Sequence, residues 1–118
     1  LGQIFTHEMK PMEVEIVVAE IDPSGRPELY RIQYDGTVAD EQHWCCIGGD
    51  AEAVLQRLKD GWSADLDRDA AVRLAVSALA GPDRSLAAEE LEVAVLSAGN
   101  GRRCFKRLDD AETDSLLT

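Results

Sequence analysis

The residues of this chain whose types could do chemistry lie together in the segment 43–50, which reads HWCCIGGD. A histidine beside two cysteines carries the donor atoms of a zinc site, or of a thiol nucleophile with its base. The other interpretation is structural, a buried strand that runs into a turn and a helix. The choice between them decides whether this segment is an active site.

The spacing of these residues favours the structural interpretation. In a strand, Cys45 and Cys46 point to opposite faces and cannot chelate one ion together. The other histidine, His7, and the other cysteine, Cys104, add no pair with the spacing of a structural zinc site. A Cys45–His43 nucleophile and base also need a third group to orient the histidine, and none is near in sequence. Because free cysteine is among the most buried residue types, we expect both cysteines in a core strand.

The glycine pair that follows the cysteines resembles a phosphate-binding loop, since it precedes a predicted helix. The chain has neither the GxxxxGK[ST] nor the GxGxxG frame, and Asp50 would place a negative charge beside the phosphate. We therefore interpret Gly48-Gly49 as a turn, with Asp50 as the N-cap of the helix after it.

A third candidate is an alternating run of carboxylates, Asp65, Asp67 and Asp69, as in a calcium-binding loop. Position 70 is Ala where such a loop needs glycine, and position 76 is Val where it needs glutamate. The run is better interpreted as the solvated start of a helix. The sequence thus predicts no catalytic, cofactor-binding or metal-binding residue.

Composition and charge restrict the class of protein. The 118 residues are enough for one domain at most, and 45% hydrophobic with 30% charged residues fits a soluble globular protein. A net charge of −11 argues against nucleic acid and anionic membranes as partners. No signal peptide and no run of about 18 apolar residues is present, so we expect a cytoplasmic protein. Because the chain begins with Leu1 in what reads as the end of a helix, we interpret it as a piece of a longer protein.

The elements that position these residues follow from the period of the apolar positions. The predicted order is a helix end over 1–10, three strands within 13–47, two helices within 50–81, two strands within 90–108 and a tail over 109–118. The third strand is expected to run from Thr37 through Ile47 and so to include both cysteines. Because strands and helices are grouped along the chain, the order predicts an α+β fold in a single partial domain.

Several blocks of sequence in this order resemble the second half of a 20S proteasome α-subunit of the actinobacterial type. The main blocks are LGQIFTHEMKPMEVEIVVAEI, RPELYRIQYDGTVADEQHW and CCIGGDAEAVLQRLK, with LEVAVL and RRCFKR at the last two strands. The chain departs from the family at Cys45 and Cys46, where family members usually carry aliphatic residues. The resemblance implies the C-terminal portion of a four-layer αββα sandwich, the N-terminal nucleophile hydrolase fold.

The resemblance also implies a function. Such α-subunits are non-catalytic components of a threonine-type endopeptidase complex. They form the outer heptameric ring, template assembly of the β-subunits and gate substrate entry for ATP-dependent protein degradation. In actinobacteria the degraded substrates are pupylated proteins. The expected partners are other α-subunits, β-subunits and a ring ATPase, with no cofactor. The gating segment and the lysine that receives the ATPase lie in the other half of family members, so no position here is assigned to them.

Two alternatives stay open at the level of the sequence. In one, the chain comes from a catalytic β-type subunit whose N-terminal threonine lies in a part that these residues do not include. In the other, it is a small dimeric binding module without a link to a protease. Half of a sandwich would expose strand edges and apolar faces, so we also expect the isolated chain to self-associate.

Overall fold

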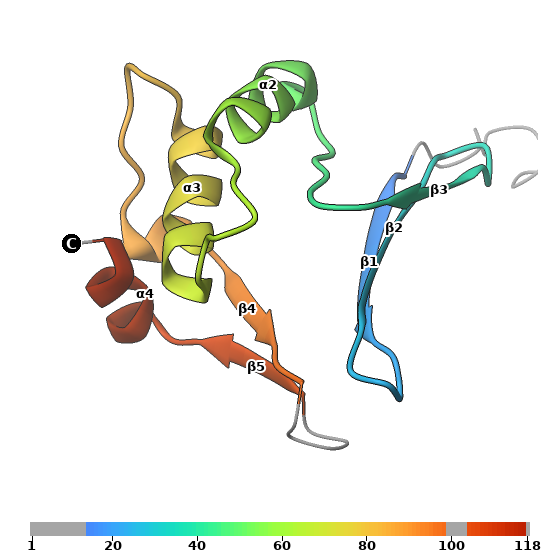
Figure 1. Cartoon of the computed structure of the whole chain (residues 1–118). Coiled ribbons are helices and arrows are strands. Elements are labelled where there is room, and N and C mark those ends of the chain that lie inside the picture. The colour runs from blue at the N-terminus through green and yellow to red at the C-terminus, as the bar shows by residue number, and fades with distance from the viewer. Residues whose placement is uncertain (1–13, 99–103, 118) are drawn as a thin grey trace, which may run out of the picture.

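The structure is a computed structural model in which residues 14–98 and 104–117 are described. The elements are β1 (Ile16–Ile21), β2 (Pro27–Ile32), β3 (Val38–Glu41), α2 (Ala51–Gly61), α3 (Arg68–Ala80), the 3-10 helix η1 (Ala88–Glu90), β4 (Val93–Leu96), β5 (Phe105–Leu108) and α4 (Asp110–Leu117). These elements make an α+β arrangement, which confirms the predicted class (Figure 1). The helix end expected over 1–10 lies outside the described residues.

The first three strands form one antiparallel sheet in the order β1-β2-β3, with Val18 opposite Tyr30 and Tyr30 opposite Asp40. The β1–β2 turn is fixed by Asp22, whose Oδ1 accepts hydrogen bonds from the backbone N–H groups of Ser24 and Arg26, both at 2.9 Å. The Ser24 hydroxyl donates to the same oxygen at 2.6 Å. These bonds, first that from the Ser24 hydroxyl, lower the pKa of Asp22, because they stabilise the carboxylate.

The third strand ends at Glu41, so the prediction that it continues through Ile47 is wrong. Residues 43–47 have no regular secondary structure and leave the sheet toward the helices. The physical reason is a contact distant in sequence. The Trp44 ring packs against Trp62 and against the helical core, and a chain held in the sheet could not deliver it there.

The helices α2 and α3 form the core of the molecule. Val54 and Leu58 of α2 are buried against Ala78 of α3, with Trp44, Cys46, Leu55 and Leu74 packed around them. Gly61 allows the close approach, because a Cβ there would overlap the Leu74 side chain. Arg57 Nη1 donates to the carbonyl oxygen of Ala78 at 2.7 Å, which satisfies one of the free carbonyls at the end of α3.

The last part of the chain is a hairpin followed by a helix. β4 and β5 pair antiparallel, with Val93 opposite Leu108. Asp109 and Glu112 then bond reciprocally, each carboxylate accepting from the other's backbone N–H at 2.8 and 3.3 Å, a capping box that starts α4. Most of the residues interpreted as a tail from 109 onward therefore form a helix, which buries Thr113 and Leu116.

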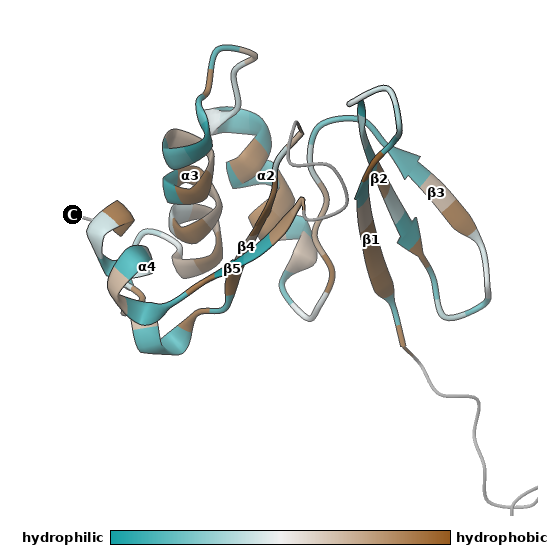
Figure 2. Cartoon of the chain, turned by 90° about the horizontal axis from the view of Figure 1, so that it is seen from below, coloured by the Kyte–Doolittle hydropathy of each residue, from teal (hydrophilic) through white to brown (hydrophobic). Residues whose placement is uncertain are grey.

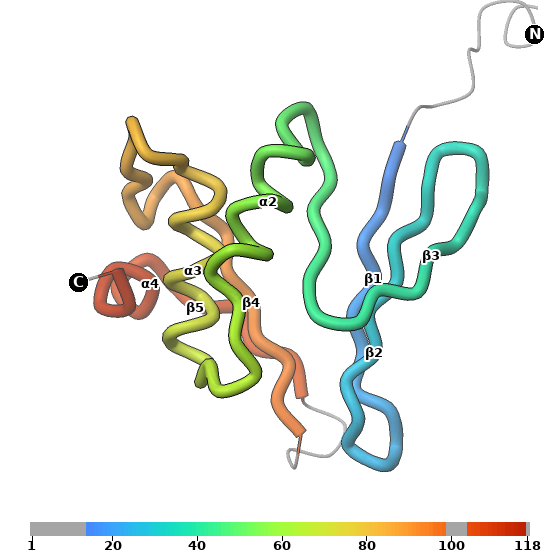
Figure 3. Tube along the Cα trace, turned by 45° about the horizontal axis from the view of Figure 1, so that its top comes forward, coloured from blue at the N-terminus to red at the C-terminus, as the bar shows by residue number. Residues whose placement is uncertain are grey.

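The two sheets lie side by side, with the helices on the β4–β5 side (Figures 1 and 3). Among the described residues, every buried hydrophobic side chain belongs to a helix, to η1 or to β5, and none belongs to the sheet β1–β3. Hydropathy colouring shows the same contrast, with β1 strongly apolar yet away from the helical core (Figure 2). The sheet β1–β3 is consequently the less buried part of the molecule.

The packing at Gly61 gives a first prediction. The added methyl group of Gly61→Ala meets Cδ1 of Leu74, so the substitution should stabilise the unmodified chain less, by about 1 kcal/mol, than it stabilises a Leu74→Ala background. Urea denaturation measures both changes. The gain that alanine has over glycine in a helix is common to the two backgrounds, so their difference isolates the contact. Equal changes in the two backgrounds would contradict this account of the helix contact.

A second prediction concerns acid. A carboxyl whose pKa is lowered in the folded state stabilises the fold above its unfolded pKa, and that contribution is lost as the pH falls through the folded value. The pKa of Asp22 is lowered in this way. From about pH 5 to about pH 3, the unmodified chain should therefore lose more thermal stability than Asp22→Asn. Asp83→Asn, at an exposed loop aspartate, should retain the full acid dependence.

Candidate functional site

The histidine of the segment 43–50 is held by tryptophan rings. The centroid of the His43 ring lies 4.2 Å from that of Trp62 and 5.7 Å from that of Trp44. The two tryptophan rings lie 5.5 Å apart. Trp62 follows α2 directly, so the end of that helix brings it to the segment. The three rings make an aromatic cluster, in which both ring contacts of His43 are with tryptophan side chains.

The two cysteines are half-buried in irregular chain and not in a core strand. Burial raises the pKa of the Cys45 thiol, and the nearby Glu41 carboxylate raises it further. Burial also raises the pKa of Cys46, whose Sγ donates to the carbonyl oxygen of Ile47 at 3.6 Å. A thiol with a raised pKa carries less thiolate at neutral pH and is a poorer nucleophile. Cys46 instead packs against the helical core.

No metal centre forms among the residues that the structure describes. Within 14–98 and 104–117, no group of three or more His, Cys, Asp or Glu side chains is placed to hold an ion. Cys104 precedes β5 in the other sheet, and His7 lies outside the described residues.

The turn and cap expected after the cysteines are present in part. Gly48 has a φ of 117°, which favours glycine, and α2 begins at Ala51. Asp50 occupies the N-cap position, but its side chain makes no capping hydrogen bond. The segment therefore turns the chain into α2, as predicted, without the side-chain bond that the aspartate suggested.

The three aspartates of the alternating run have separate roles around the start of α3. Asp67 is the N-cap, and its Oδ1 accepts from the Ala70 N–H at 2.8 Å. Asp69 forms an exposed ion pair with Arg68 at 2.9 Å. The backbone N–H of Asp65 donates to the Ser63 hydroxyl oxygen at 3.2 Å. Asp67 and Asp69 thus act at the start of α3, in line with the interpretation drawn from the sequence, and Asp65 lies in the turn before it.

One charged contact was missed by sequence reasoning. Arg31 of β2 donates to Glu15 at 3.2 Å and to Glu41 of β3 at 3.4 Å, so it spans the width of the sheet. All three side chains are partly exposed, between 27% and 38%, so solvent weakens the contribution of the bridge to stability. Finding it requires the strand register, which no local pattern of the sequence contains.

The surface of the molecule is notable for exposed apolar side chains. Ile16, Val17 and Val18 of β1 are 48%, 38% and 38% exposed. A second apolar feature is a groove of about 430 Å³ between α3 and β4, lined mainly by Ala71, Val72, Ala75, Leu79 and the residues of β4.

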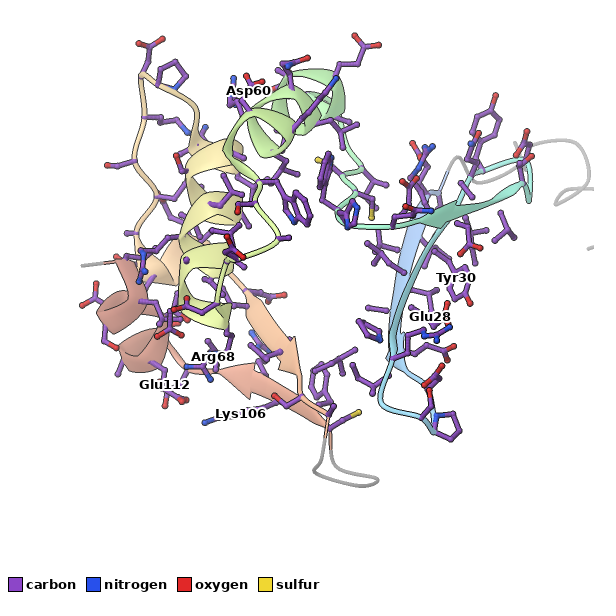
Figure 4. The ribbon with its side chains drawn as sticks, viewed as in Figure 1. Glu28, Tyr30, Asp60, Arg68, Lys106 and Glu112 are labelled. Carbon is purple, nitrogen blue, oxygen red and sulfur yellow. The ribbon has the colours of Figure 1, made fainter. Side chains whose placement is uncertain are left out.

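Figure 4 shows Glu28 and Tyr30 on the face of the sheet turned away from the helices, where the Tyr30 hydroxyl donates to Glu28 at 3.1 Å. These surfaces are suited to packing against other polypeptide.

Comparisons with known proteins identify what this chain is similar to. The family described as "Proteasome subunit" matches residues 1–96. "Proteasome subunit alpha" of Rhodococcus opacus is 44% identical over 126 residues, covering 99% of this chain and 49% of the relative. The protein of the same name from Acidimicrobium ferrooxidans is 44% identical over 118 residues, covering 99% and 51%. That of Mycolicibacterium smegmatis is 43% identical over 125 residues, covering 99% and 51%. The chain thus spans about half the length of these relatives.

The aromatic contacts of His43 give a third prediction. If His43 acted as the base of Cys45, removing it would slow alkylation of that thiol by a factor of ten or more. We expect His43→Ala to leave the iodoacetamide rate at Cys45 within about twofold at pH 7, because the ring of His43 packs against the rings of Trp62 and Trp44. Peptide mass spectrometry after timed quenching resolves each cysteine.

The control for this experiment is Trp62→Phe, which keeps an aromatic partner for the imidazole and leaves Cys45 in place. A tenfold slower reaction in His43→Ala alone would contradict the structural interpretation of the segment and restore the catalytic one.

Proposed function

The chain belongs to the proteasome subunit family, and we propose that it forms part of an alpha-type subunit of the 20S core particle. One observation carries the proposal: 99% of the chain aligns, at 42–44% identity, with relatives named proteasome subunit alpha. The recognition made from the sequence blocks is confirmed at the level of this family. Because the chain spans about half of each relative, the properties of the whole subunit remain part of the proposal.

In this proposal, residues 1–118 are the C-terminal portion of a single domain with the four-layer αββα sandwich. Two separate antiparallel sheets support it, since β1 of one lies near β4 of the other. The helices α3 and α4 on the β4–β5 side are compatible with one outer layer. The sheet β1–β3 contributes no buried hydrophobic side chain, which is what an incomplete sandwich would give.

The proposed role is structural and gating rather than catalytic. The complete subunit would join others of its kind in the outer heptameric ring, template the β-subunit ring and narrow the entrance to the proteolytic chamber. A ring ATPase would deliver pupylated substrates to it in the cytoplasm. The raised pKa values of Cys45 and Cys46 support a role without thiol chemistry. Of the helices that the structure describes, none combines the length and apolar character that a membrane span needs.

A chimeric subunit tests this function. The half of Acidimicrobium ferrooxidans proteasome subunit alpha that this chain matches is replaced by residues 1–118, and the chimera is expressed with the proteasome β-type subunit of that organism. We expect heptameric stacked rings in negative-stain electron microscopy, because the matched half carries 44% identity over its whole length.

Two controls make the result interpretable. The unmodified Acidimicrobium subunit should give the same rings, and circular dichroism should show that the chimera is folded. A folded chimera that forms no rings would contradict the alpha-type assignment. Peptidase activity that persists when the β-subunit's threonine is replaced would favour the catalytic alternative instead.

A further inference from the structure

We draw no further inference here: the strongest candidate, the apolar groove of about 430 Å³ between α3 and β4, carries none, because the chain spans about half the length of its relatives and nothing in the structure shows what covers this groove.

Discussion

The contact between α2 and α3 is the interaction on which the rest of the described structure depends. Because Gly61 has no side chain, Leu74 of α3 can pack against α2 at that position. The packed helices bury Val54, Leu58 and Ala78 between them. Trp44 is drawn onto this core, which ends β3 at Glu41 and carries the cysteines out of the sheet. The segment that suggested catalysis is thus shaped by helix packing.

The distribution of buried surface has a second consequence. The helical side holds the buried apolar residues, whereas the sheet β1–β3 is held by its ladder hydrogen bonds, its turns and the partly exposed bridge at Arg31. Such a sheet has little packing energy of its own, since three strands need a covered apolar face for independent stability. The apolar character of β1 therefore makes sense only beside further polypeptide.

The sequence predicted what depends on local chemistry. The turn at Gly48-Gly49 depends on the freedom of glycine at positive φ, and the helix start at Asp67 depends on a hydrogen bond over three residues. The end of β3 could not be predicted, because it depends on Trp44 meeting Trp62 across the whole of α2. The bridge at Arg31 could not be predicted, because the carboxylates of Glu15 and Glu41 come close to Arg31 only once the strands are in register. The family was recognisable because whole blocks match in order, whatever their local conformation.

If this chain carries the matched half of an alpha-type subunit, it should replace that half in a working ring. The most direct measurement is native mass spectrometry of a tagged chimera, built on the Acidimicrobium ferrooxidans subunit, co-expressed with the untagged authentic subunit. We expect a ladder of ring masses, in which the chimera and the authentic subunit mix at every stoichiometry. Rings made only of authentic subunits, beside a folded but unincorporated chimera, would contradict it.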